Sequence, residues 1–373
     1  MKIGIDVSQV NYPGTGVGTY TYNLVKALLE DQSGHEFVLF GGSLRKFSSL
    51  KQQLESFNVQ KKLYLVPPLG MDLIFNRLHT LPIELFTGTI DVFHSSDWAQ
   101  PSSTKARLVT TIHDLTTIKY PQHQHPKIIT THARRLKRVK EDGIHIIADS
   151  KATKKDIIHT LGIESNKIDV VHLAASQDFT DFSLLERRER HNKVEKVKRK
   201  YKINGQYVLS VGTNEPRKNI SSVIRAFSQL RELSHPNLEL VIAGKFGWGT
   251  TSQPEVSTAV NQVGFVDQKD LPALYAGASV FVYPSFYEGF GLPVLEAMTV
   301  GTPVVTSNKG SLAETVENAG VVVDPHSVQS ITNGLVEAIR NSKEFQKLGK
   351  KQANKFSWKK TAEATLSIYQ KLV

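Results

Sequence analysis

The chain contains the stretch Tyr287-Glu-Gly-Phe-Gly-Leu-Pro-Val-Leu-Glu-Ala-Met298. Two carboxylates in it, Glu288 and Glu296, lie on either side of a glycine-rich turn. Glycine lets the backbone approach a ligand closely, and Pro293 suits the first turn of a helix. Because the N–H groups at a helix start favour an anion, the stretch predicts a loop and helix that hold a phosphorylated sugar. We expect Glu296 in the first turn of that helix, where both carboxylates can accept hydrogen bonds from hydroxyls of one ligand.

Short apolar runs alternate with helical segments along the chain, and this pattern predicts parallel sheets. The strands expected in the first half are Ile3–Val7, Phe37–Phe40, Val92–His94, Leu108–Ile112, Ile144–Ala148 and Ile168–His172. Those expected in the second half are Tyr207–Val211, Leu238–Ala243, Val280–Tyr283, Pro303–Thr306 and Gly320–Val323. The expected fold class is α/β, with two doubly wound Rossmann-like domains that hold a ligand in the cleft between them.

A chain of 373 residues is long enough for two domains, each with its own core. We expect an N-terminal domain over residues 1–176 and a C-terminal domain over residues 177–355. The charged stretch Asp178–Lys200 predicts a helix just after this boundary. The last segment, residues 356–373, is amphipathic, but its periodicity alone does not show where it packs.

The composition restricts the kind of protein further. The chain has no cysteine, which excludes disulfides and thiolate metal sites and is compatible with a reducing cytoplasm. The first residues indicate a strand rather than a signal peptide, and no apolar run approaches the roughly 20 residues that span a bilayer. We expect a cytoplasmic protein.

The chain carries 46 lysines and arginines against 35 acids, a net charge of +11, which favours an anionic partner. The stretch Lys119–Lys140 contains no acid. It is interpreted either as a solvated face or as a docking face for an anionic membrane. Nucleic acid is not an expected partner, because no recognised motif or interleaved aromatics accompany these cations.

The spacing of Glu288 and Glu296 resembles the glutamate motif of the retaining glycosyltransferases of family 4, which have the two-domain GT-B fold. The resemblance extends over nearly the whole chain. It implies that the helix of residues 356–373 packs back on the first domain, which faces the acceptor, and that the second domain binds the nucleotide-sugar. Glu288 would contact the transferred sugar and Glu296 the ribose. The loop residues implied to bind the donor are Gly289, Phe290, Gly291 and Leu292.

Two other segments carry candidate phosphate contacts. Behind the first strand lies the loop from Pro13 to Gly18, which alone could be a structural turn; the resemblance implies that its Gly16 faces the donor diphosphate. The first strand of the second half ends at Gly212 and is followed by Arg217 and Lys218. These cations would neutralise a departing diphosphate, although a solvated basic turn is the alternative.

Many family members have an arginine directly after the strand-end glycine, where this chain has Thr213. Arg217 and Lys218 would therefore carry the role. Lys245, at the end of a later strand, is a further phosphate candidate, with an ordinary surface lysine as the alternative.

His113 closes the strand Leu108–Ile112 and matches the family histidine that approaches the hydroxyls of the donor sugar. A structural histidine is the alternative, and we expect Asp114 to orient the ring. His123 and His125 have no third ligand at a suitable spacing, so no metal site is expected. The resemblance also implies no cofactor, because Arg and Lys neutralise the leaving group in this family.

Three segments look like the mannosyltransferase branch of the family: Val211–Asn219, Thr111–Leu115 and Pro303–Asn308. They imply transfer of mannose from GDP-mannose to an acceptor hydroxyl of a glycan or lipid-linked saccharide, as in polysaccharide biosynthesis. Glucose and N-acetylglucosamine donors stay open. The basic stretch favours a membrane-associated acceptor and a peripheral place on the inner membrane face. The competing hypotheses are a non-catalytic glycan- or nucleotide-binding partner on the same fold and a sugar-nucleotide epimerase.

Overall fold

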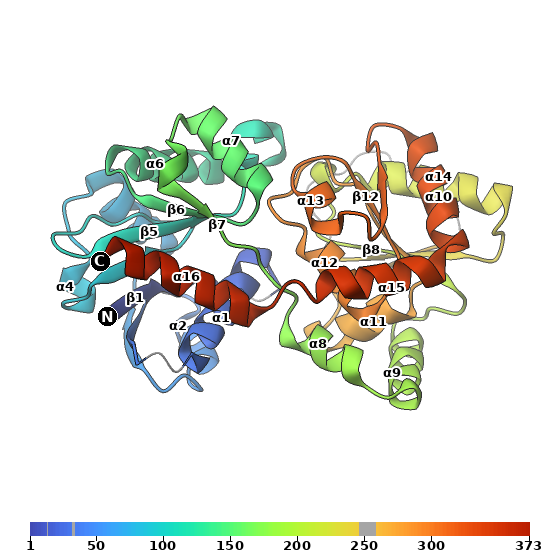
Figure 1. Ribbon diagram of the computed structural model, residues 1–373, viewed down its shortest axis with the longest axis horizontal. Coiled ribbons are helices and arrows are strands. Elements are labelled where there is room, and N and C mark those ends of the chain that lie inside the picture. Colours follow the sequence, from blue (N-terminus) through green and yellow to red (C-terminus); the bar gives the residue numbers. More distant parts are fainter. Residues whose placement is uncertain (13, 32–33, 246–258) are drawn as a thin grey trace. The chain divides into compact units, whose positions relative to one another are not determined.

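The computed structural model describes residues 1–12, 14–31, 34–245 and 259–373. The chain divides into two compact units (Figure 1). Unit 1 comprises Met1–Leu173 and Ser357–Val373, and unit 2 comprises Ala174–Phe356. The division after Leu173 lies close to the expected boundary after residue 176.

Each unit is built on one parallel sheet. Among the described residues, the order in unit 1 is β3-β2-β1-β4-β5-β6-β7 and in unit 2 it is β10-β9-β8-β11-β12-β13. The strands of unit 1 are β1 (Lys2–Asp6), β2 (Glu36–Gly42), β3 (Gln60–Tyr64), β4 (Val92–Ser95), β5 (Arg107–Ile112), β6 (His145–Ala148) and β7 (Ile168–Val170). Those of unit 2 are β8 (Tyr207–Val211), β9 (Glu239–Ala243), β10 (Val260–Gly264), β11 (Val280–Tyr283), β12 (Val304–Ser307) and β13 (Val321–Val323). The expected α/β class with two doubly wound sheets is confirmed.

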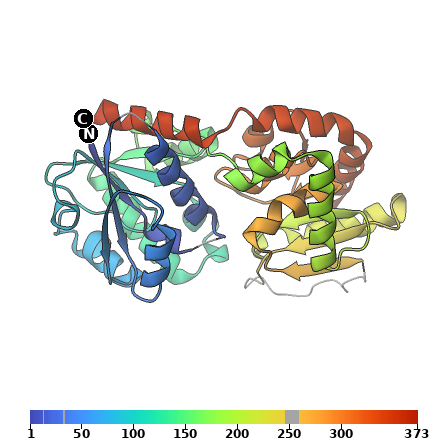
Figure 2. The same ribbon diagram turned by 90° about the horizontal axis from the view of Figure 1, so that it is seen from below.

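Helices cover the sheets (Figures 1 and 2). Unit 1 contains α1 (Gly16–Glu30), α2 (Phe47–Gln53), α3 (Pro68–Met71), α4 (Glu84–Thr87), α5 (Thr116–Lys119), α6 (Pro126–Glu141), α7 (Lys151–Leu161) and α16 (Trp358–Leu372). Unit 2 contains α8 (Gln177–Leu184), α9 (Arg187–Lys200), α10 (Ile220–Leu233), α11 (Leu271–Gly277), α12 (Leu292–Val300), α13 (Leu312–Val316), α14 (Val328–Arg340) and α15 (Ser342–Ala353). Short helical turns are η1 (Ser8–Asn11), the π-helix η2 (Asp72–Leu78), η3 (Pro121–His123), η4 (Ser165–Lys167), η5 (Pro216–Lys218) and η6 (Gln268–Asp270). Among the helices of these residues, none has both the length and the apolar composition needed to cross a membrane.

The last helix of the chain belongs to unit 1. α16 packs beside α1, and both views show the two side by side (Figures 1 and 2). The Tyr369 hydroxyl lies 2.6 Å from His94 Nδ1, and Thr361 Oγ1 donates to the carbonyl of His172 at 2.8 Å. Tyr369 and His94 are both buried, so α16 completes the core of unit 1.

Two expectations about helices need correction. The charged stretch Asp178–Lys200 is not one helix, because Leu185 and Glu186 between α8 and α9 have extended backbone. α12 begins at Leu292 with Gly291 as its N-cap, so Glu296 lies one turn further along than expected. Gly291, with a φ of 92°, ends the loop in the left-handed region. Pro293 lies in the first turn as expected, but Glu296 is the fifth residue of the helix and so lies at the start of the second turn.

Candidate functional site

The strand orders place one candidate site in each unit. In an open parallel sheet, a ligand binds beyond the carboxyl ends of the strands where the order reverses. This reversal occurs between β1 and β4 in unit 1, and between β8 and β11 in unit 2. The loops that follow these four strands contain most of the residues singled out from the sequence.

In unit 2, the loops after β8 and β11 bring Arg217, Lys218 and Glu288 together. Glu288 Oε1 lies 2.7 Å from both Lys218 Nζ and Arg217 Nη1. The hydroxyls of Ser285 and Tyr283 donate to the same oxygen, at 2.7 and 3.0 Å. The three charged side chains are only 11 to 12% exposed. One carboxylate oxygen therefore fixes both cations at the end of the sheet.

Arg217 makes further contacts inside the protein. Its Nη2 donates to Glu215 Oε1 at 2.5 Å, and its Nη1 donates to the carbonyl of Tyr287 at 2.6 Å. Glu215 is buried and was not singled out from the sequence, although it stands in the same Glu-Pro-Arg-Lys run. Because the guanidinium binds two carboxylates and a carbonyl, Arg217 joins the two loops. Lys218 is the better placed of the two cations to meet a ligand.

The charges of the cluster alter the pKa values of its members. Burial opposes ionisation of Glu288, but the nearby Arg217 and Lys218 outweigh it and lower the pKa of the Glu288 carboxyl to about 2. Burial, together with the charge of Arg217, lowers the pKa of the Lys218 ammonium. The carboxylate is therefore held in its ionised form, and the lysine is held in a less polar environment than water.

The backbone around the cluster explains the position of Lys218. Gly212 directly follows β8 and has a φ of 151°, a backbone conformation that residues other than glycine rarely adopt. A Cβ at this position would lie 3.6 Å from Lys218 Cε, so the lysine side chain packs directly over the glycine.

The other donor-binding candidates of unit 2 take several positions. Gly289 lies in the loop between β11 and α12, and Leu292 is the first residue of α12. Phe290 is buried, with its ring centroid 5.7 Å from that of Phe356, so its ring is part of the core. Lys245 follows β9, is exposed, and holds its ammonium 5.5 Å from the ring of Phe265.

The carboxyl of Glu296 is a weaker acid than an ordinary glutamate. Burial raises its pKa to about 8, and the nearby Tyr275 hydroxyl opposes this effect only in part. At neutral pH the folded protein therefore holds Glu296 mainly in its protonated form, whereas Glu288 is ionised. The two glutamates of the motif differ in charge although they stand on one loop and helix.

Replacement of Glu296 by glutamine should make stability less dependent on pH. The unfolded carboxyl ionises near pH 4.5, whereas the folded one stays protonated until about pH 8, so this group lowers stability progressively as the pH rises between these values. We expect Glu296→Gln to raise the thermal unfolding midpoint at pH 8 and to leave it nearly unchanged at pH 4.5. Glu337→Gln, on the exposed side of α14, is the control. An equal shift at both pH values would contradict the assigned pKa.

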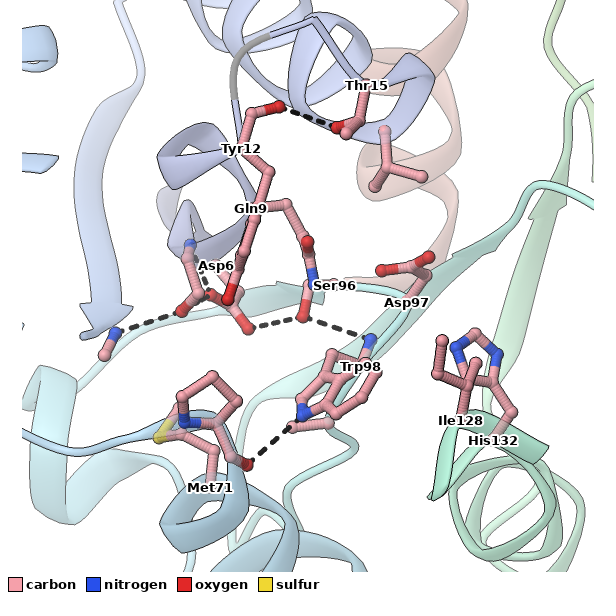
Figure 3. A pocket seen from close by; sticks show the side chains of 15 residues that line it. Asp6, Gln9, Tyr12, Thr15, Met71, Ser96, Asp97, Trp98, Ile128 and His132 are labelled. Atoms are coloured by element: carbon pink, nitrogen blue, oxygen red, sulfur yellow. Dashed lines mark hydrogen bonds between the residues drawn. The ribbon is translucent and has the colours of Figure 1, made fainter. Parts of the chain in front are cut away.

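Unit 1 contains a cavity of about 380 Å³ beyond β1 and β4 (Figure 3). Its wall includes Asp6, Tyr12, Asp97, Trp98 and His132. Asp97 Oδ1 is buried and has no hydrogen-bond partner among the described residues. Aromatic rings beside carboxylates suit a polyhydroxy ligand, because the rings cover apolar sugar faces and the carboxylates accept hydroxyls. The sequence did not single out this cavity.

His113 directly follows β5, as expected, but Asp114 does not orient it. His113 Nδ1 donates to Asp149 Oδ2 at 2.6 Å, whereas Asp114 accepts from the N–H of Thr116. Burial opposes the imidazolium, but the Asp149 carboxylate outweighs it and raises the pKa of His113. Tyr20 packs edge-on against the ring, with centroids 4.6 Å apart. Asp149 follows β6, the strand next to β5, so only the sheet order could have revealed it.

The predicted glycine loop leads directly into α1. Pro13 lies outside the described residues. Gly16 is the first residue of α1, and Thr15 caps the helix by accepting from the N–H of Gly18 at 3.2 Å. Apart from its chain neighbours and the backbone of α1, no atom of the described residues lies within 4 Å of a Cβ built on Gly16, so this side of the helix start is open to a ligand.

The basic stretch Lys119–Lys140 is less solvated than expected. Arg134 pairs with the buried Asp72 at 2.5 Å. Arg135 is 1% exposed and donates to the carbonyl of Ser96 at 3.1 Å. Arg138 donates to the carbonyl of Asn76 at 3.0 Å. These arginines join α6 to η2 and to the sheet instead of lying on the surface as a group.

The described part of the chain holds no cluster of three or more His, Cys, Asp or Glu side chains suited to a metal ion. His123 stacks on Tyr120, with ring centroids 5.8 Å apart, and His125 caps α6 by accepting from the N–H of Lys127. Both histidines therefore have local structural contacts.

Comparison with known proteins matches a separate family model to each half of the chain. Residues 14–176 match the family described as Glycosyltransferase Family 4, and residues 193–355 match Glycosyl transferases group 1. O-antigen chain mannosyltransferase B of Escherichia coli is 32% identical over 396 residues, with both chains covered completely. The chain belongs to glycosyltransferase family 4. The family and the class of enzyme expected from the sequence are thus confirmed.

The glycosyltransferase also resembles other mannosyltransferases. The serotype-specific mannosyltransferase WbdA of Escherichia coli is 30% identical over 247 residues, which cover 61% of this chain and 29% of WbdA. Among solved structures, the sucrose-phosphate synthase of Thermosynechococcus elongatus has a TM-score of 0.70 at 18% identity, covering 100% of this chain and 99% of that one. The glycosyltransferase WaaG has a TM-score of 0.67 at 16% identity, covering 99% of each chain. These structures establish the GT-B fold of the glycosyltransferase.

Proposed function

We propose that the enzyme transfers mannose from GDP-mannose, with retention of configuration, to a hydroxyl of a glycan or lipid-linked saccharide. The observation that carries the proposal is the fixed pair of Lys218 and Glu288 at the strand-order reversal of unit 2. The full-length similarity to an O-antigen chain mannosyltransferase supports mannose as the sugar. A related solved structure, Anabaena HepE, is described as a complex with UDP and glucose, which supports a nucleotide-sugar as the class of donor.

In this proposal the donor diphosphate lies beside Lys218, and no catalytic metal or other cofactor takes part. As the bond between sugar and phosphate breaks, negative charge grows on the leaving oxygens, and the ammonium of Lys218 stabilises it. Arg217 holds the two loops together. Glu288 holds both cations in position and faces the sugar. Glu296 binds the ribose, and the N–H groups of residues 289–292 complete the donor site.

The cavity of unit 1 is the proposed acceptor site. Trp98 and Tyr12 would cover the faces of the acceptor sugar, and Asp97 would accept one of its hydroxyls. His113, held by Asp149, would approach the hydroxyls of the donor sugar. In the proposed reaction the acceptor oxygen forms a bond to the sugar carbon, the bond from that carbon to the diphosphate oxygen breaks, and the acceptor proton passes to the departing phosphate.

A panel of nucleotide-sugars tests the proposal. The purified enzyme is incubated with GDP-mannose, UDP-glucose and UDP-N-acetylglucosamine, and the thermal unfolding midpoint and the release of nucleoside diphosphate are measured. We expect GDP-mannose to raise the midpoint most and to be hydrolysed slowly without acceptor. If only a UDP-sugar raised the midpoint, that sugar nucleotide would be the donor instead of GDP-mannose. If none of the three raised it, the non-catalytic alternative would be favoured. Repetition with EDTA tests metal independence, since loss of release would contradict it.

A further inference from the structure

Unit 1 exposes an unusual concentration of leucines. Of the fourteen large apolar side chains that are exposed among the described residues, six lie between residues 65 and 85. Leu69, Leu73 and Leu78 are 62, 47 and 59% exposed, and Leu65 just before them is 63% exposed. We call these four residues the leucine face. Single exposed leucines are ordinary, but a group in one short segment marks an interaction site.

The helical geometry places three of these leucines on one side. Leu69 and Leu73 are four residues apart, about one α-helical turn. From Asp72 the chain continues as the π-helix η2, whose wider turn is closed by the N–H of His79 donating to the carbonyl of Ile74 at 2.9 Å. The wider turn brings Leu78, five residues after Leu73, to the same side.

The opposite side of the same helical segment is anchored in the protein. Met71, Asp72, Phe75 and Asn76 are all buried. Asp72 also binds Arg134 of α6, which holds η2 against that helix. The leucines are therefore exposed by a firmly packed segment and not by a loose one.

The charges around the leucine face sum to a positive value. Between residues 61 and 78 the chain has three cations, Lys61, Lys62 and Arg77, and one acid, the buried Asp72, which pairs with Arg77 at 3.3 Å. The neighbouring helix α6 adds the exposed Lys137 and Lys140 and the acid Glu141, which pairs with Lys137 at 3.6 Å. Apolar side chains with basic neighbours match a lipid surface that carries anionic headgroups.

The same segment also forms a wall of the unit 1 cavity. Pro68 and Met71 of α3 line it, while Leu69 of the same turn is exposed and belongs to the leucine face. Trp98 Nε1 donates to the carbonyl of Pro68 at 3.2 Å and fixes this turn to the cavity (Figure 3). A surface bound to the leucine face would therefore lie one helical turn from the cavity.

We infer that the leucine face docks on an anionic lipid surface and presents the unit 1 cavity to an acceptor held in that surface. The inference rests on the proposed function only in taking the acceptor to be lipid-linked. It differs from the surface expected from the sequence, because the arginines of α6 serve to hold η2 and the leucines make the contact.

Flotation of the full chain with vesicles tests the inference. Phosphatidylcholine vesicles with and without phosphatidylglycerol are compared, with no sugar nucleotide present. We expect binding to the anionic vesicles, weakened when NaCl is raised from about 0.05 to about 0.5 M. The double variant Leu69→Gln with Leu73→Gln should bind roughly tenfold or more weakly. Its thermal unfolding midpoint should equal that of the parent, because both leucines are exposed.

The matched control carries Leu184→Gln and Leu233→Gln, two leucines of unit 2 that are more exposed than Leu69 and Leu73. Undiminished binding by the Leu69 and Leu73 variant, or an equal loss in the control, would overturn the inference. So would a parent that binds no vesicles and instead self-associates through this face in sedimentation velocity. Vesicle binding needs no donor, so the two proposals can fail separately. Vesicle binding by an enzyme that no nucleotide-sugar stabilises would refute the proposed function alone. Stabilisation by a nucleotide-sugar without vesicle binding would refute the docking face alone.

Discussion

Replacement of Glu288 by glutamine is expected to reduce turnover roughly 10²- to 10³-fold while weakening donor binding much less. The amide keeps the shape of the side chain but cannot balance Arg217 and Lys218, which both lie 2.7 Å from the carboxylate oxygen. The cations would then shift away from the positions at which they meet the diphosphate. Turnover is measured as nucleoside diphosphate released from GDP-mannose, well below the unfolding temperature. Unchanged turnover would remove Glu288 from the active site.

The same variant should be less stable, by about 3 to 5 kcal/mol at pH 7, because two largely buried cations lose their partner. The folded pKa of Glu288, about 2, lies below the unfolded value of 4.5. Its contribution is therefore present above pH 4.5 and is lost as the pH falls towards 2. Urea unfolding of parent and variant should differ clearly at pH 7 and much less near pH 2.5. Glu317→Gln, whose carboxylate pairs with Lys355 on the surface, should show neither effect.

Lys218→Ala is expected to lower turnover roughly 10- to 1,000-fold and to weaken the affinity for GDP. The ammonium of Lys218 is held beyond β8 by Glu288 and the Tyr283 hydroxyl. Within the described part of the chain Lys218 forms an ion pair with Glu288, whereas Arg217 pairs with both Glu215 and Glu288. Lys218→Arg keeps the charge but not the compact ammonium, so it should recover only part of the rate.

Comparison with Arg217→Lys distinguishes the roles of the two cations. We expect Arg217→Lys to lower stability more than GDP affinity, because the lysine cannot reach Glu215, Glu288 and the Tyr287 carbonyl together. Lys355→Ala, at an exposed pair in the same unit, is the control. If Lys218→Ala turned over donor as fast as the parent and bound GDP as tightly, the diphosphate site would have to lie elsewhere.

Sequence patterns predicted every strand with neighbours on both sides, and also the edge strands β7 and β13. The two that they missed, β3 and β10, are each the first strand in the order of their sheet. Their sequences, Gln-Lys-Lys-Leu-Tyr and Val-Asn-Gln-Val-Gly, are polar because an edge strand is covered less completely. Hydrophobic runs reveal buried strands, and they reveal edges poorly.

The candidate site divides in a similar way. Glu288, Lys218 and His113 could be proposed because they follow predicted strands and match motifs of the family that the chain resembles. Their partners could not, since Asp149 is brought to His113 across 36 residues by the pairing of β5 and β6. The opposite protonation of Glu288 and Glu296 also depends on packing, because burial acts on both carboxyls but Arg217 and Lys218 lie beside Glu288.

The return of α16 to unit 1 also affects the order in which the chain can fold. Unit 2 ends at Phe356, and the residues that complete unit 1 follow it. During synthesis on the ribosome, all of unit 2 therefore emerges before Tyr369 can cover His94. Multidomain chains usually fold from the N-terminus, but here the last step is reversed. Unit 2 can fold completely while part of the core of unit 1 is still uncovered. During this interval the uncovered part of the unit 1 core is open to aggregation and to chaperones.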